Sequence, residues 1–190
     1  MTKTTPQSLT QVLTQRKKKI VNSWIQDALH TYPAKSAEFF SRQKDQFANP
    51  IGATLSRELE AIFDELLLEH SSDKLSDSVD AIVRFRAVQD FSPSQAVAFF
   101  WSLKRIIRRE AGASVVELGL INQLLEFEDR IDQLGMLAFE LYVKCREKIW
   151  ELKAKEAQSR TSNLLKRNAN VTWTVSDEAT GTSQSQEPLE

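Results

Sequence analysis

Residues that could perform chemistry are few and widely spaced in this 190-residue chain. The two histidines, His30 and His70, each fall in the last turn of an expected helix, where a cation interacts favourably with the helix dipole. A metal or haem site would need further ligands at fixed offsets, and none accompanies either histidine. The single cysteine, Cys145, lies on an apolar stripe with no histidine near it in sequence. We expect structural roles for all three residues, and no cofactor.

Carboxylates are numerous, but their spacing places them on solvated faces of helices. Glu58, Glu60, Asp64 and Glu65 offer no pair in an apolar setting, which a general acid and base would require. The chain also contains no glycine-rich phosphate loop, no G-x-S-x-G and no H-E-x-x-H motif. The sequence therefore predicts a protein without enzymatic activity.

Four cations form the strongest candidate for a charged binding surface: Lys104, Arg105, Arg108 and Arg109. On a helix the three arginines share one side, opposite the apolar residues of the same segment. Such a cluster can bind an acidic partner or an anion through charge-assisted hydrogen bonds. Arg84 and Arg86, earlier in the chain, are candidates to join it. Surface ion pairing within the chain is the alternative interpretation.

Four aromatic residues suggest a second candidate site: Trp24, Phe99, Phe100 and Trp101. Aromatic side chains line many small-molecule pockets, so these residues could hold a ligand. The alternative is an ordinary hydrophobic core, since large aromatic residues are also the usual filling of helical cores.

The composition and the spacing of apolar residues predict an all-α, multi-helical fold. The chain has only 5 glycines and 5 prolines, and no proline lies between Pro93 and Pro188. Ser8 is an expected N-cap, and Ser92, Pro93 and Gln95 predict a capping box. The main helices are expected over residues 8–32, 54–70, 75–88, 92–112 and 114–166.

The last expected helix, which begins at Ser114, carries an apolar stripe at alternating steps of three and four residues. The stripe consists of Ile121, Leu124, Glu128, Ile131, Gly135, Ala138, Tyr142, Cys145, Ile149 and Leu152. Glu128 and Gly135 are its two imperfect members. Past Tyr142 the rest of the helix surface is strongly polar, so we expect the end of the stripe to contact a partner. The predicted partner-binding residues are Tyr142, Cys145, Ile149 and Leu152, together with Arg105, Arg108 and Arg109.

The length of this helix suggests a division of the chain. Residues 114–166 would span roughly 75–80 Å as one helix, whereas a globule of about 150 residues is roughly 40 Å across. The helix must break, with Gly119 and Gly135 the favoured places, or its second half must extend beyond the core. We favour the second alternative. The predicted domains are a helical domain over 1–142, an amphipathic helix over 143–168 and a disordered tail over 169–190.

The overall charge excludes some classes of partner. Lysine and arginine (25) nearly balance aspartate and glutamate (26), so no general attraction to nucleic acid or to an anionic membrane is expected. No apolar run approaches the roughly 20 residues that span a bilayer. The polar start of the chain, MTKTTPQSLTQ, lacks the apolar segment of a signal peptide. We therefore expect a cytoplasmic protein without membrane insertion.

Two stretches carry a family resemblance. DQFANPIG (Asp45–Gly52), preceded by Trp24 and Tyr32-Pro33, resembles the N-terminal domain of RsbRD-type proteins, co-antagonists of the RsbT kinase in the bacterial stressosome. IVRFRAVQDFSPSQAVAFFWSLKRIIR (Ile82–Arg108) resembles a second block of the same family. The resemblance covers about residues 9–142. It implies a helical sensory domain, globin-like in arrangement but without haem, that forms homodimers and controls an output domain.

The sequence departs from the full-length pattern of this family after residue 142. An RsbRD-type protein would continue into a STAS domain with phosphorylatable serine or threonine, whereas this chain has a charged helix and a polar tail. FELYVKCREKIWELKAKE (Phe139–Glu156) is similar to the ending of stand-alone family members from sulfate-reducing bacteria. That likeness implies a role accessory to dissimilatory sulfur metabolism.

Together these observations predict a non-enzymatic signalling or adaptor module that binds a protein partner and forms a homodimer. The alternative is a small-molecule sensor whose ligand lies among Trp24, Phe99, Phe100 and Trp101.

Overall fold

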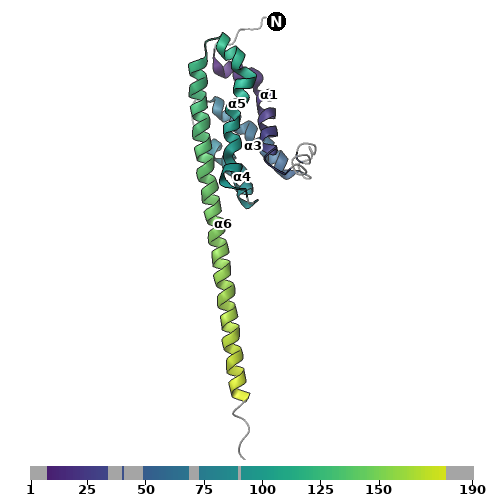
Figure 1. Cartoon of the computed structure of the whole chain (residues 1–190), viewed down its shortest axis with the longest axis vertical. Helices are drawn as coiled ribbons and strands as arrows, with labels where there is room; N and C mark the ends of the chain where they lie inside the picture. Colours follow the sequence, from purple (N-terminus) through teal and green to yellow (C-terminus); the bar gives the residue numbers. More distant parts are fainter. Residues whose placement is uncertain (1–7, 34–39, 41–48, 69–72, 90, 179–190) are drawn as a thin grey trace, which may run out of the picture. The chain divides into compact units, whose positions relative to one another are not determined.

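The computed structural model describes residues 8–33, 40, 49–68, 73–89 and 91–178, and in this part of the chain every element is an α-helix and no strand occurs. The all-α, multi-helical prediction is thereby confirmed. The helices, labelled as in Figure 1, are α1 (Leu9–Leu29), α3 (Pro50–Leu67), α4 (Asp73–Val88), α5 (Pro93–Glu117) and α6 (Ile121–Glu178).

Two predicted helix starts are confirmed, and a third lies earlier than expected. The Ser8 hydroxyl accepts a hydrogen bond from the Gln11 amide at 3.3 Å. In the capping box before α5, the Gln95 amide donates to Ser92 Oγ, and the Ser92 amide donates to Gln95 Oε1 at 3.1 Å. The helix expected from residue 54 begins instead at Pro50, because the Asn49 side chain accepts from the Gly52 amide at 2.8 Å and caps it.

The expected boundary between the last two helices was wrong. Ser114 does not cap the last helix but lies inside α5, which continues past Gly112 to Glu117. The break occurs at Gly119, whose φ of 67° suits glycine. The Leu120 amide donates to the Val115 carbonyl at 2.9 Å and the Gly119 amide to the Val116 carbonyl at 3.2 Å. This pairing is a Schellman motif, which satisfies the last carbonyls of α5 and turns the chain into α6.

The chain divides into two compact units, residues 1–146 and 147–190. In the first unit, α1, α3, α4 and α5 bury their apolar faces, and Figure 1 shows α5 beside the first part of α6. The fully buried large side chains include Trp24, Phe63, Phe100, Phe127 and Tyr142. In the second unit, the side chains of residues 151–166 are all exposed. The helical backbone of α6 continues to Glu178, within the segment that the sequence assigned to a tail.

The two imperfect members of the α6 stripe, Glu128 and Gly135, each contact a specific residue of α5. Glu128 is buried, and both of its carboxylate oxygens accept hydrogen bonds from the Arg108 guanidinium. Gly135 lies against the Trp101 indole, so a Cβ at this position would come within 2.3 Å of Trp101 Cζ2. The indole is held there by a 2.9 Å hydrogen bond from its Nε1 to Asp132. Gly135 therefore does not break α6 but permits its close approach to α5.

Candidate functional site

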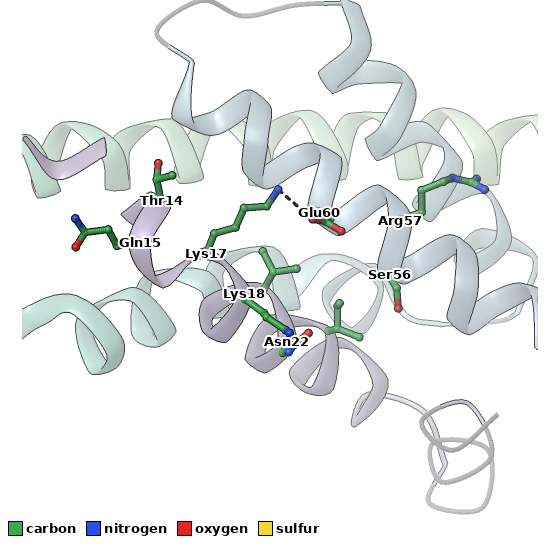
Figure 2. Close-up of a pocket in the computed structure, with 10 residues that line it drawn as sticks. Thr14, Gln15, Lys17, Lys18, Asn22, Ser56, Arg57 and Glu60 are labelled. Carbon is green, nitrogen blue, oxygen red and sulfur yellow. Dashed lines mark ion pairs between the residues drawn. The ribbon is translucent and has the colours of Figure 1, made fainter. Parts of the chain in front are cut away.

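A groove of about 610 Å³ lies between α1 and α3 (Figure 2). Its apolar lining consists of Val21 and Ile25, and polar or charged side chains supply the rest: Thr14, Gln15, Lys17, Lys18, Asn22, Ser56, Arg57 and Glu60. The Lys17 ammonium crosses the groove to Glu60 at 3.0 Å and also contacts Asp64 at 2.7 Å. These hydrogen bonds raise the pKa of Lys17, and the bond to Asp64 has the largest effect. The groove therefore presents hydrogen-bonding groups whose charges are largely compensated. It was not predicted from the sequence, because the residues that line it are scattered surface residues.

The predicted cationic cluster on α5 is distributed among ion pairs. Each of its members contacts a carboxylate of the same chain: Lys104 with Asp132, Arg105 with Asp27, Arg108 with Glu128 and Arg109 with Glu110. Arg84 pairs with Asp80 on its own helix and Arg86 is buried, so neither joins the cluster. The arrangement matches the alternative that the sequence left open, which is surface ion pairing within the chain. Arg105 reaches α1, Lys104 and Arg108 reach α6, and Arg109 pairs within α5.

Glu110 is the centre of the polar contact between α1 and α5. Its buried carboxylate contacts Lys19 Nζ and Arg109 Nε, each at 2.7 Å. Arg16 donates to the Glu110 carbonyl at 2.7 Å and to Ser114 Oγ at 2.9 Å. The hydrogen bonds from Lys19 and Arg109 hold the pKa of Glu110 below its usual value.

Replacing Glu110 with glutamine should therefore lower the free energy of unfolding most at neutral pH. A depressed carboxyl pKa contributes stability above the ordinary glutamate range, and this contribution is lost as the pH falls through the lowered value. The difference between wild type and Glu110→Gln in urea unfolding should narrow from about pH 7 to about pH 3. The exposed Glu117 on the same helix provides the control, because Glu117→Gln should leave the curve unchanged. A difference that stays constant with pH would contradict this assignment.

The predicted aromatic pocket is divided between two places. Trp24, Phe99 and Phe100 pack together in the core, where Trp24 Nε1 donates to the Phe99 carbonyl at 2.8 Å. The rings of Phe99 and Phe100 lie 4.2 Å apart, and Trp24 meets Phe100 edge-on at 6.2 Å. Trp101 is half-buried and packs against α6 instead. The structure therefore brings three of the four residues together as packed neighbours.

A buried cation, Arg86, was not predicted from the sequence. Its guanidinium lies 4.3 Å from the ring centre of Phe99, 5.1 Å from that of Tyr32 and 5.2 Å from that of Phe91. It donates to the carbonyls of Ala28, Gln95 and Ala96 at 3.0–3.4 Å. Burial lowers the pKa of Arg86 to about 10, and burial raises that of Tyr32. Arg86 thus binds the C-terminal end of α1 to α4 and α5.

The predicted partner-binding stripe on α6 changes from buried to exposed along the helix. Tyr142 belongs to the core, because it is 1% exposed and its hydroxyl donates to the Phe91 carbonyl. Cys145 and Ile149 are half-buried, and burial raises the pKa of the Cys145 thiol. Leu152 is exposed. Three further exposed apolar residues of this segment were not predicted: Trp150, Leu164 and Leu165.

The structure describes one of the two histidines, His30. His30 is exposed and its amide caps the end of α1, while His70 lies outside the described residues. No helix in the described part of the chain is both long enough and apolar enough to cross a membrane.

Comparisons with known proteins give one family match and one similar protein. The model of the RsbT co-antagonist protein rsbRD N-terminal domain matches residues 18–157. A protein of the archaeon Archaeoglobus fulgidus, described only as uncharacterized, is 30% identical over 152 residues, which are 79% of this chain and 90% of that protein. No solved structure gives a significant match. The family match covers α3, α4, α5, most of α1 and the first part of α6, so the chain belongs to the family of the RsbT co-antagonist rsbRD N-terminal domain.

Proposed function

We propose that this chain is a cytoplasmic, non-enzymatic signalling module that works by binding another protein. The family supports this proposal, because a domain of a co-antagonist acts on other proteins through contacts with them. A stressosome-like role is the form of signalling that the family favours. A role beside dissimilatory sulfur metabolism rests on the likeness of Phe139–Glu156 to stand-alone family members, and it defines one class of partner to look for.

The observation that supports protein binding most directly is the surface of α6 after Arg146. Four of its large apolar side chains are between 57% and 65% exposed: Trp150, Leu152, Leu164 and Leu165. At helical spacing Trp150, Leu164 and Leu165 fall on one side of α6, and Leu152 lies on the other. An apolar side of this kind suits a helix that packs against a second protein. Scattered single apolar residues are normal on a surface, whereas several on one helical segment indicate a contact region.

A photoreactive amino acid at position 164 of the full chain tests this proposal in cells of the source organism. We expect irradiation to give a discrete covalent adduct with a protein that mass spectrometry identifies. The matched control places the same amino acid at Gln26, an exposed position on α1, and should give no such adduct. Trp150→Glu in the position-164 chain should remove most of the adduct, because it introduces a charge into the contact.

Absence of adducts at position 164, or equal labelling at both positions, would contradict binding through this segment of α6. Substitution at an exposed helical position does not disturb the core, so the folded state of each variant can be checked by its circular dichroism.

A further inference from the structure

Arg86 is a buried cation whose charge no carboxylate in the described part of the chain neutralises. Its side chain is 0% exposed, and its hydrogen bonds go to the backbone carbonyls of Ala28, Gln95 and Ala96. Three aromatic rings lie against the guanidinium. Carbonyl dipoles and ring faces solvate a cation, but they carry no net charge. A buried charge is costly unless a counter-charge accompanies it, so this position favours a negatively charged group.

The two helix ends beside Arg86 do not supply that counter-charge. The last turn of α1, which includes Ala28, carries a partial negative charge that favours the cation. The first turn of α5, which includes Gln95 and Ala96, carries a partial positive charge that opposes it. Because these partial charges are similar in size and opposite in sign, the positive charge of Arg86 stays largely unbalanced.

Two buried groups at this place have no hydrogen-bond partner in the described part of the chain: Arg86 Nε and the Tyr32 hydroxyl. Tyr32 is 8% exposed, and the Arg86 guanidinium lies 5.1 Å from the centre of its ring. Burial raises the pKa of Tyr32 more than the charge of Arg86 lowers it, so the phenol keeps its proton and can donate. Buried polar groups are nearly always hydrogen-bonded, and two unpaired donors side by side indicate a site for an acceptor.

We propose that Arg86 and Tyr32 bind the carboxylate of a small organic acid. A carboxylate has two oxygens, so it can accept from Arg86 Nε and from the Tyr32 hydroxyl together, and its single charge balances that of Arg86. The rings of Phe40 and Phe91 meet the Tyr32 ring edge-on at 5.3 and 5.1 Å. Aromatic surroundings suit a ligand with an apolar body better than phosphate or sulfate, which would have to lose a strong hydration shell. This site goes beyond the proposed function and does not depend on the contact surface of α6.

Isothermal titration calorimetry of the full chain with hexanoate and benzoate tests the site. We expect saturable binding and a higher midpoint of thermal unfolding, because a ligand that binds only the folded state stabilises it. Hexanamide and benzamide have the same apolar bodies without the charge, so they should bind at least about tenfold more weakly. No saturable binding of either acid, equal binding of acid and amide, or tighter binding of inorganic phosphate or sulfate would overturn the inference.

The two tyrosines of the chain provide a matched pair of variants. Tyr32→Phe removes a hydroxyl without a partner, so the ligand-free protein should be as stable as the wild type or more stable, while benzoate should bind about tenfold more weakly. Tyr142→Phe removes a hydroxyl that donates to the Phe91 carbonyl, so it should lower the stability. If Tyr32→Phe cost as much stability as Tyr142→Phe, or bound benzoate as tightly as the wild type, the inference would be overturned.

The Nε–H signal of Arg86 in a ¹H–¹⁵N correlation spectrum reports where the acid binds. A buried Nε–H exchanges slowly with water and gives a distinct signal, which Arg86→Lys identifies by its loss. We expect this signal to move with added benzoate and to reach its end point together with the calorimetric curve. The signal of Arg105, which is 71% exposed, should stay in place. Benzoate binding that leaves the Arg86 signal unmoved would place the ligand elsewhere and overturn the inference.

Discussion

Replacing Arg86 with methionine should lower the free energy of unfolding by about 2–4 kcal/mol. The substitution keeps most of the aliphatic volume but removes the donors that reach the carbonyls of Ala28, Gln95 and Ala96. The carbonyls of Ala28 and Ala96 belong to buried residues at the junction of α1, α4 and α5, where acceptors have little access to water. The cation also leaves the faces of Tyr32, Phe91 and Phe99, and with it their attraction to the guanidinium.

Chemical unfolding followed by circular dichroism measures this effect, and two further variants define its cause. Arg86→Lys retains the charge but loses the planar group that contacts several carbonyls, so it should recover only part of the stability. Arg105→Met removes an arginine that is 71% exposed and paired with Asp27. Exposed ion pairs contribute about 0–1 kcal/mol, so this control should change the stability by no more than that. If the Arg86→Met protein were as stable as the Arg105→Met protein, the buried contacts of Arg86 would contribute no more to stability than an exposed ion pair.

Local sequence signals predicted the helical class and several helix ends correctly. Ser8 and the Ser92–Gln95 box were predictable because an N-cap is a contact between residues three positions apart. The junction of α5 and α6 was misplaced, because Ser114 has the chemistry of a cap and Gly112 that of a stop, although Gly119 was one of the two positions favoured for a break. Only the backbone at Gly119, where φ is positive, decides where the chain turns. The Schellman motif at Gly119 is itself a local signal, but in the sequence it competes with the signals of Gly112 and Ser114.

The candidate sites were harder to predict, because their meaning depends on residues far apart in sequence. The cations of α5 were visible as a group, but the carboxylates that pair with them come from α1, α5 and α6: Asp27, Glu110, Glu128 and Asp132. Arg86 was grouped with those exposed cations, although three aromatic rings from separate positions enclose it. Periodicity identifies which face of a helix is apolar, but it does not identify which polar residue is buried with it.

Much of the α6 stripe belongs to the core and not to a surface that could bind a partner. Up to Tyr142 the stripe is core, and its two irregular members are the residues that fix α5 to α6 through Arg108 and Trp101. The contact surface proposed for signalling begins only after Arg146, and it uses Trp150 and Leu164 on a different side of the helix. A variant that disturbs the first region should therefore act on stability, whereas a variant in the second should act on binding.

Gly135→Ala should destabilise the protein by about 1–3 kcal/mol, against the usual preference of helices for alanine. The added Cβ would lie 2.3 Å from Trp101 Cζ2 and 2.4 Å from its Cε2, distances that require the indole or α6 to move. Movement of the indole also strains its hydrogen bond to Asp132, which at the same time accepts from Lys104. The effect should appear as a lower midpoint of urea unfolding and as a changed fluorescence spectrum of the displaced tryptophan.

The matched control for this prediction is the same substitution at Gly112, inside α5. A Cβ there meets no atom within 4 Å, so Gly112→Ala should stabilise the helix by about 0.5–1 kcal/mol. The two variants change the composition identically and differ only in what the new methyl group contacts. If the two substitutions change the free energy of unfolding with opposite signs, the destabilisation at position 135 comes from the close approach of α6 and Trp101. Equal stabilisation at both positions would mean that α6 can withdraw from α5 without loss, and Gly135 would then have no part in the packing of α6 on α5.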